Sequence, residues 1–175
     1  MDTQQQPGLK VVVLGPGEGA AVHANATNED LIHIKVSGEQ SAGLLTVLEY
    51  NAVPHSEGVL PHIHEGHEEG FYVVEGELSM LVGHDRVVLQ PGGWGFVPRG
   101  VLHAFWNDGD APCKFVATFT PPGFEGIFFE REQLAARGFT REEMANLARK
   151  HGVMNMPWDK IDAYLAEHQE AAGER

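Results

Sequence analysis

The sequence has a single cysteine, few cationic residues and no long apolar run, and each shortage removes a class of protein. Cys113 stands alone among 175 residues, so no disulfide can form within the chain. Twelve Lys and Arg against 25 Asp and Glu give a formal charge of −13. Without cationic clusters, we expect no binding to nucleic acid and none to anionic membranes. No apolar run approaches the roughly 18 residues that span a bilayer.

The N-terminus also lacks the parts of a signal peptide. Residues Met1–Pro7 contain neither a basic region nor an apolar one. A cytoplasmic, soluble protein is therefore predicted, and the sequon Asn25-Ala26-Thr27 is interpreted as a chance match. Hydrophobic residues make up 42% of the chain, which is enough to bury the core of one domain.

Short apolar runs separated by turn residues occupy the chain from about residue 10 to about residue 120. The predicted strands are Lys10–Leu14, Leu31–Val36, Leu44–Tyr50, Val59–His64, Gly70–Glu75, Glu77–Val82, Arg86–Leu89, Trp94–Val97, His103–Asn107 and Lys114–Phe119. Turn sequences such as Pro91-Gly92-Gly93 separate them. Because no helical pattern intervenes, we predict an all-β antiparallel sandwich or barrel. Phe71-Tyr72-Val73-Val74 is apolar on both faces, so its outer face should meet a second sheet, the tail or a partner subunit.

Helical patterns begin after Pro121-Pro122-Gly123. The first predicted helix is Glu130–Arg137. The second begins at a capping box at Thr140 and runs to about Lys150, before Gly152. The third begins at about Asp159 and carries Ile161, Tyr164, Leu165 and His168 on one side. We predict one structural domain with three parts: N-terminal strands and loops in residues 1–43, a barrel in residues 44–120 and a helical tail in residues 121–175.

Three histidines and a glutamate have the spacing of metal ligands. His62 and His64 are two apart, so in a strand their side chains point to the same face. Glu69 can enter from the next strand, and His103 must come from a distant one. Imidazole and carboxylate without thiolate suit Fe, Mn, Ni, Cu or Zn. The pattern predicts one divalent transition metal inside a β-barrel. Glu68 and His67 are rivals of Glu69, and strand parity does not decide between the two glutamates, because both faces of that strand are apolar.

The same residues carry a resemblance to the cupin superfamily of small β-barrels. Its second motif is complete as Gly92, Pro98, Gly100, His103 and Asn107, and its first motif appears as His62, His64, Glu69 and Gly76. One position departs, because Ser56 stands where the motif has glycine, and the nearest glycine is Gly58. The resemblance covers about residues 44–119. It implies an antiparallel double-stranded β-helix in which His62, His64, Glu69 and His103 ligate the metal, with iron favoured, and the motif spacing favours Glu69 over Glu68.

Within that superfamily the chain is similar to the quercetin 2,3-dioxygenase-like group. The resemblance implies a homodimeric dioxygenase that acts with O2 on a small oxygenated aromatic or enol-type substrate. Glu69 would be the catalytic residue, serving as both ligand and general base. Two alternatives remain open. One is a non-oxidative, metal-assisted isomerase, decarboxylase or polyketide cyclase, and the other is a non-enzymatic small-ligand-binding cupin.

Two phenylalanines are candidates for the substrate pocket. Phe105 shares strand parity with His103, and Phe71 shares it with Glu69. The remaining aromatic residues near the second motif, Trp94, Phe96 and Phe119, are predicted to belong to the core. Histidines outside both motifs are predicted to lie at the surface or to be satisfied locally; these are His23, His33, His55, His84, His151 and His168.

Overall fold

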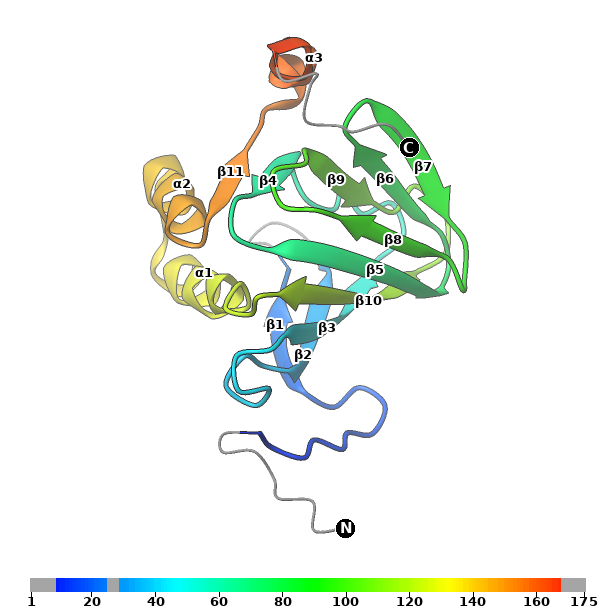
Figure 1. Ribbon diagram of the computed structural model, residues 1–175, viewed down its shortest axis with the longest axis vertical. Coiled ribbons are helices and arrows are strands. Elements are labelled where there is room, and N and C mark those ends of the chain that lie inside the picture. Colours follow the sequence, from blue (N-terminus) through cyan, green and yellow to red (C-terminus); the bar gives the residue numbers. More distant parts are fainter. Residues whose placement is uncertain (1–8, 25–28, 168–175) are drawn as a thin grey trace.

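The computed structural model describes residues 9–24 and 29–167, and it consists of two facing antiparallel β-sheets with helices after them (Figure 1). The six-stranded sheet has the order β1 (Ala20–His23), β2 (Leu31–Val36), β3 (Thr46–Ala52), β10 (Cys113–Thr120), β5 (Glu68–Glu75) and β8 (Trp94–Val97). The five-stranded sheet has the order β11 (Val153–Asn155), β4 (His62–His64), β9 (His103–Trp106), β6 (Leu78–Val82) and β7 (Asp85–Leu89). The prediction of an all-β fold with a helical tail is confirmed.

The main core lies between the two sheets. Phe71 of β5 and Phe115 of β10 come from the six-stranded sheet, and Leu78 and Met80 of β6 come from the other. All four side chains are fully buried. Alternation along β5 explains the pattern, because every second side chain of a strand points to the same face.

A second apolar cluster lies on the outer face of the five-stranded sheet. Ile63 lies between His62 and His64 in β4, so its side chain points away from theirs and packs with Leu81 and Ala104. Helix α3 (Ile161–Glu167), which follows the short 3₁₀ helix η1 (Trp158–Lys160), completes this cluster with Ile161 and Leu165. The end of the tail thus covers a face of the barrel, and Ile161 and Leu165 are buried as the amphipathic pattern predicted.

Helices α1 (Gly126–Arg137) and α2 (Arg141–Lys150) lie together beside the sheets (Figure 1). Ile127 and Phe128 of α1 are buried in the main core. The predicted capping box of α2 is confirmed, because Thr140 Oγ1 accepts from the Glu143 amide while the Glu143 carboxylate accepts from the Thr140 amide. Helix α1 begins four residues earlier than predicted, and those extra residues anchor it to the barrel.

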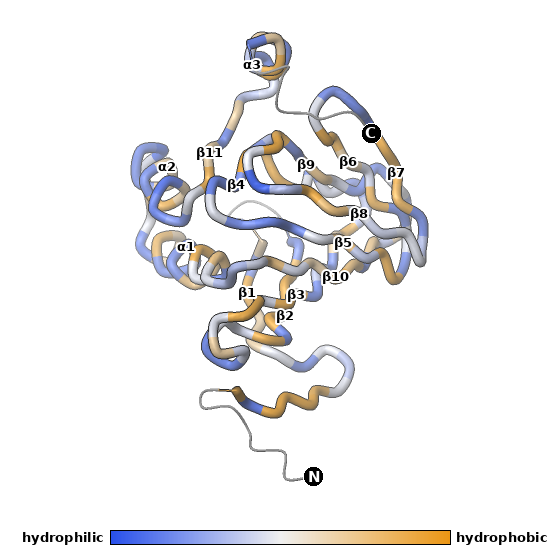
Figure 2. Tube along the Cα trace, in the orientation of Figure 1, coloured by the Kyte–Doolittle hydropathy of each residue, from blue (hydrophilic) through white to orange (hydrophobic). Residues whose placement is uncertain are grey.

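Two strands were not predicted, and one predicted strand is wrong. β1 and β11 form by pairing with β2 and β4. Lys10–Leu14 belongs to neither sheet, and Val11 and Val13 are 84% and 88% exposed. This run is the orange stretch near the N-terminus in Figure 2. Its β-prone sequence has no neighbouring strand to pair with in the described part of the chain.

The predicted burial of two aromatic residues is also wrong. Trp94 and Phe96 of β8 are 54% and 55% exposed, because the inward positions of that strand belong to Gly95 and Val97. The prediction for Phe119 is confirmed, since its ring is buried.

None of the helices within residues 9–24 and 29–167 combines the length and apolar content needed to cross a membrane. The sequon at residues 25–27, His168 and the last residues of the tail lie outside the described part of the chain.

Candidate metal centre

Four buried side chains from three strands converge between the sheets. His62 and His64 are the two ends of β4, and His103 begins β9 and pairs with His62 across the five-stranded sheet. Glu69 enters from β5 in the facing sheet. One potential ligand atom from each residue lies within 4.8 Å of all the others. The two halves of the sequence pattern are therefore brought to one point inside the barrel.

The potential ligand atoms of the cluster lie within hydrogen-bond distance of one another. The Nε2 atoms of His62 and His64 are 3.2 Å apart. The Oε2 atom of Glu69 lies 3.2 Å from Nε2 of His64 and 3.1 Å from Nε2 of His103. All four side chains are at least nine-tenths buried, so bulk water does not separate them.

Backbone carbonyls fix the orientation of two of the imidazole rings. Nδ1 of His62 donates to the Leu60 carbonyl at 2.8 Å, and Nδ1 of His103 donates to the Val101 carbonyl at 3.0 Å. In a neutral ring, the proton on Nδ1 leaves a lone pair on Nε2. The lone pairs therefore face the cluster and the carboxylate of Glu69. Facing acceptors need a cation between them, which is either a metal ion or a proton on Nε2 that forms a hydrogen bond to the carboxylate.

The electrostatics of the cluster agree with this arrangement. Burial lowers the pKa of His62 well below its ordinary value, and the neighbouring His103 and His64 rings act in the same direction. For Glu69, burial alone would raise the pKa, but hydrogen bonds from His103 and His64 outweigh burial and lower the pKa to about 2. The carboxylate is thus ionised at neutral pH and the His62 ring is neutral, which are the protonation states of metal ligands.

The donor set fits a divalent transition metal. Three imidazole nitrogens and one carboxylate oxygen, without thiolate, are borderline-to-hard ligands. Leu60 and Val101 supply the carbonyl partners that commonly orient metal-binding histidines. The ring of His64 is held differently, by edge-on contacts with Phe119 and Phe124 at 5.6 and 4.6 Å between centroids.

Geometry separates Glu69 from its two rivals. Glu68 points outward and forms a bidentate ion pair with Arg99, in which the second contact is 2.8 Å. Nδ1 of His67 donates to the Pro121 carbonyl at 2.7 Å, and His67 is only half-buried. Neither residue belongs to the buried cluster.

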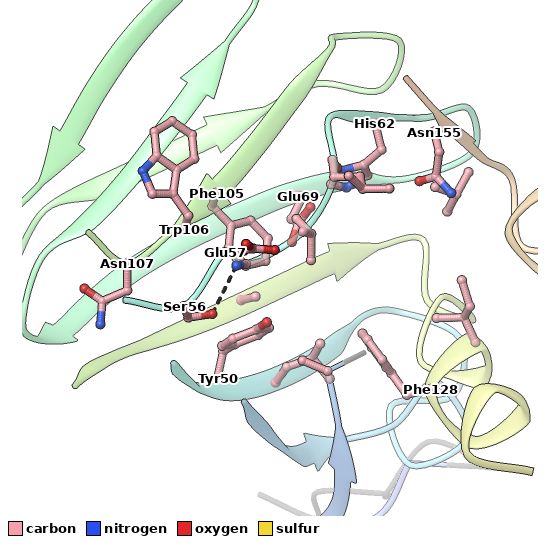
Figure 3. A pocket seen from close by; sticks show the side chains of 18 of the residues that line it. Tyr50, Ser56, Glu57, His62, Glu69, Phe105, Trp106, Asn107, Phe128 and Asn155 are labelled. Carbon is pink, nitrogen blue, oxygen red and sulfur yellow. Dashed lines mark hydrogen bonds between the residues drawn. The ribbon is translucent and has the colours of Figure 1, made fainter. Parts of the chain in front are cut away.

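The loop before β4 explains why serine occupies the expected glycine position. Ser56 is buried and its hydroxyl donates to Oδ2 of Asp30, while the Gly58 amide donates to Ser56 Oγ (Figure 3). Gly58 has φ +63°, and an added Cβ would meet the Phe105 carbonyl oxygen at 1.9 Å. The position that requires glycine has therefore moved by two residues. Asn107 is buried beneath the same loop and donates to the Val53 and Ala111 carbonyls.

A cavity of about 1220 Å³ opens beside the cluster, with His62, His64 and Glu69 in its wall. Figure 3 shows Tyr50, Phe105 and Phe128 around the same space. The Tyr50 ring stacks on Phe115 at 4.8 Å and meets Phe105 edge-on at 5.3 Å. Of the two predicted pocket residues, Phe105 lines the cavity, whereas Phe71 packs edge-on against Phe105 at 5.6 Å and is fully buried.

Part of the cavity wall comes from the helical tail and was not predicted from the sequence. Phe124, Phe128 and Arg131 line the cavity from the start of α1 and the turn before it. They lie outside both motifs, and helical periodicity alone does not show which face of α1 meets the barrel. The signal that could have located this wall is the group of apolar residues just before the predicted helix, Phe124, Ile127 and Phe128.

The remaining described histidines lie apart from the cluster. His23 and His84 are exposed, and His33 lies 3.5 Å from Glu49. His55 pairs with Asp110 at 2.9 Å, and His151 pairs with Glu130 at 3.1 Å. Each therefore has a surface position or a local partner, as predicted.

Comparison with known proteins agrees with the cupin resemblance seen in the sequence. Residues 50–119 match the model of the cupin domain. The chain is 37% identical over 116 residues to a quercetin 2,3-dioxygenase from Aspergillus japonicus, covering 61% of this chain and 33% of the relative. It is 29% identical over 126 residues to a quercetin 2,3-dioxygenase from Bacillus subtilis, covering 72% of this chain and 36% of the relative. The chain thus spans about a third of the length of these relatives.

Solved structures show the same fold. The polyketide cyclase RemF from Streptomyces resistomycificus superposes with a TM-score of 0.55 at 22% identity, covering 63% of this chain and 79% of that one. A predicted oxalate decarboxylase from Thermotoga maritima gives a TM-score of 0.55 at 22% identity, covering 63% and 97%. With the two motifs and the domain match, these likenesses identify the fold as an antiparallel double-stranded β-helix. Residues 50–119 thus carry a cupin domain, and the similarity to two quercetin 2,3-dioxygenases confirms the resemblance seen in the sequence.

Proposed function

We propose that the protein is a metal-dependent dioxygenase acting on a small oxygenated aromatic or enol-type substrate. The observation that carries the proposal is the convergence of three imidazoles and one carboxylate in the wall of a cavity of about 1220 Å³. Similarity to two proteins named quercetin 2,3-dioxygenase supports the reaction class. The cavity exceeds the usual size of small-molecule sites, roughly 300–1,000 Å³, so an aromatic substrate fits within it.

In this proposal His62, His64, Glu69 and His103 hold the metal. When bound, the metal would supply Lewis acidity and positions for a substrate oxygen and O2. Glu69 is the proposed catalytic residue, because its ionised carboxylate can accept the proton of a substrate hydroxyl.

The aromatic wall positions the substrate and excludes water. Tyr50, Phe105 and Phe115 line one continuous part of the cavity and contact one another through their rings. Aromatic rings prefer stacked or edge-on partners, so this wall favours a planar substrate. The two pocket predictions take different roles in this proposal: Phe105 touches the substrate, and Phe71 supports Phe105 from behind.

The test combines elemental analysis with O2 uptake on natively purified protein. We expect about one equivalent of transition metal per chain and O2 consumption when quercetin, as a flavonol probe, is added. Glu69→Gln should lower both the metal content and the rate by at least about tenfold. Mutation of residues that merely hydrogen-bond to a metal ligand commonly costs this much in metal affinity or activity, and loss of a ligand should cost no less. Glu68→Gln is the matched control, since Glu68 pairs with Arg99 at the surface.

Other outcomes would select the alternatives. Substrate turnover that continues under strict anaerobiosis, or with zinc substituted, would identify a non-oxidative isomerase, decarboxylase or cyclase. A protein that binds metal and ligand without turnover would be a binding cupin. Protein that does not bind added metal would contradict the assignment of the metal site.

We further propose iron as the metal and the cytoplasm as the location. Iron accepts the nitrogen and oxygen donors of the cluster, as Mn, Ni, Cu and Zn also do. The single cysteine is buried and free, which is compatible with a reducing compartment.

We also propose a homodimer. Tyr72 and Val74 of β5 and Trp94 and Phe96 of β8 are between 41% and 55% exposed. They lie on the outer face at the edge of the six-stranded sheet, where Tyr72 is paired with Trp94. We call these four residues the edge patch. Contiguous exposed apolar patches of this kind mark interaction surfaces, and a second copy of the chain offers a matching apolar surface.

A further inference from the structure

Arg131 places a cationic group in the wall of the cavity that holds the candidate metal centre. It comes from α1, in the tail, whereas the metal-ligating candidates come from the barrel. Its guanidinium carbon lies 5.3 Å from the centroid of the Phe128 ring, which also lines the cavity. The cation therefore lies over an aromatic face at the cavity wall.

The guanidinium has no anionic partner in the described part of the chain. Within residues 9–24 and 29–167, Arg131 forms neither an ion pair nor a hydrogen bond. The two acidic residues beside it in sequence are engaged elsewhere. Glu130 pairs with Lys150 at 2.6 Å and with His151 at 3.1 Å. Glu132 accepts a hydrogen bond from the His23 amide at 3.0 Å.

Arg131 is half-buried, so water reaches its guanidinium only in part. Burial lowers the pKa of Arg131 from its ordinary value, and the neighbouring Tyr50 acts in the opposite direction. Buried charges in proteins are normally paired, because removing them from water is unfavourable without a partner. A half-buried guanidinium without an anionic partner is available to an anionic ligand that enters the cavity.

We propose that Arg131 binds a carboxylate of the substrate while the reacting part of the substrate lies at the candidate metal centre. The inference rests on the proposed function only in assuming that the metal site and the cavity serve one ligand. Arginine presents parallel N–H donors that match the two oxygens of a carboxylate. The substrate class is thus narrowed to aromatic or enol-type acids.

The surroundings of Arg131 favour a monoanion. Phe128, Ile127, Met144 and Ala148 are apolar residues of the same cavity lining, and the other arginine of the lining, Arg86, lies over the Trp106 ring. A phosphate, with nearly two charges at neutral pH, would need more than one cation there. A phenol of ordinary pKa, about 10, would be largely uncharged at neutral pH, whereas a carboxylate is ionised. The carboxylate is therefore the anion that fits one guanidinium in an apolar wall.

Binding of benzoate and benzamide to the metal-loaded protein tests the proposal by calorimetry. The two probes have nearly the same shape and differ in charge. We expect wild type to bind benzoate at least about tenfold more tightly than benzamide, the effect of a charge-assisted hydrogen bond. Arg131→Gln should abolish this preference, and Arg131→Lys should restore only part of it. Arg137→Gln is the control, since Arg137 lies on the same helix and pairs with Glu143 at the surface.

A second variant separates binding at Arg131 from binding at the metal. In metal-free Glu69→Gln protein, the preference for benzoate should persist, because Arg131 is unchanged. Loss of the preference there, or its survival in Arg131→Gln, would overturn the proposal. Failure of O2 uptake with the benzoate preference intact would contradict the dioxygenase and leave the carboxylate site standing. Unchanged metal content in Arg131→Gln shows that the variant is folded.

Discussion

At the scale of single residues, the ionisation of Glu69 links the candidate metal centre to the stability of the fold. Its carboxylate is buried and lies within hydrogen-bond distance of the Nε2 atoms of His64 and His103. These contacts exist only when the chain is folded. The pKa of Glu69 is therefore about 2 in the folded chain and close to 4.5, the ordinary value, in the unfolded one. The ionised carboxylate stabilises the folded state above pH 4.5.

This linkage predicts how the metal-free protein responds to acid. A lowered folded-state pKa gives stability that is present above the unfolded pKa and is lost as pH falls toward 2. We expect wild type to lose up to about 3 kcal/mol of unfolding free energy from this group between pH 5 and pH 2. Glu69→Gln should lack this component. Urea unfolding of both proteins across that range measures it, and parallel pH profiles would contradict the assignment.

The candidate ligands could be predicted from the sequence, whereas most of the cavity wall could not. His62, His64, Glu69 and His103 form a short gapped pattern whose geometry follows from strand alternation. Tyr50 and Arg131 have no such pattern. Their place beside the ligands depends on how β3 and α1 pack on the barrel, and this is a property of tertiary contacts rather than of local spacing.

At the scale of elements, the loop between β3 and β4 sets the position of the first two histidines. Val59 donates its amide to the Phe105 carbonyl at 3.1 Å, and the Asn107 amide donates to the Ser56 carbonyl at 3.0 Å. Asp30 anchors the loop by accepting from Val53, and Tyr50 donates to the same carboxylate. The loop thereby connects β4, which carries two of the candidate metal ligands, to the aromatic wall of the cavity.

We predict that Gly58→Ala disrupts this loop. Alanine at φ +63° is strained, and its Cβ would overlap the Phe105 carbonyl oxygen. The backbone must therefore move, and the unfolding free energy should fall by at least about 2 kcal/mol. Gly66→Ala is the control, because an added Cβ there meets nothing within 4 Å. Equal urea midpoints for the two variants would contradict this account of the loop.

The elements that sequence analysis missed depend on their partners. β1 contains two alanines, which have low strand propensity, and it forms because β2 lies beside it. β11 has only three residues and adds to the free side of β4. Lys10–Leu14 shows the reverse, since it has a strong strand pattern and no partner strand among the described residues. In β8, Trp94 and Phe96 were predicted to be core residues, but Gly95 faces inward and packs closely against Leu89 and Met80.

At the scale of the whole molecule, the barrel and the tail contribute different parts of one site. The barrel provides the three histidines and the glutamate, and the tail provides one wall of the cavity through α1. The tail then continues through β11, which extends the sheet of β4, and α3, which covers the outer face of that sheet. The tail is thus positioned to influence which ligand reaches the cluster of candidate metal ligands in the barrel.

The edge patch gives the last prediction, that two copies associate through the outer face of β5 and β8. Trp94→Lys places a charge in its centre and should weaken the dimer by at least about tenfold, since buried aromatic residues dominate interface energies. Val88→Lys is the matched control, because Val88 of β7 is 53% exposed at the edge of the other sheet. Sedimentation equilibrium over a range of concentrations measures both variants against wild type.

If wild type is a monomer at micromolar concentration, the proposed dimer is wrong. If Trp94→Lys and Val88→Lys weaken the dimer equally, the interface does not lie at the edge patch. Metal content should stay the same in Trp94→Lys, because the ligands face the opposite side of β5 from Tyr72 and Trp94. Association and metal binding are then separable properties of one sheet, the first carried by its outer face and the second by its inner face.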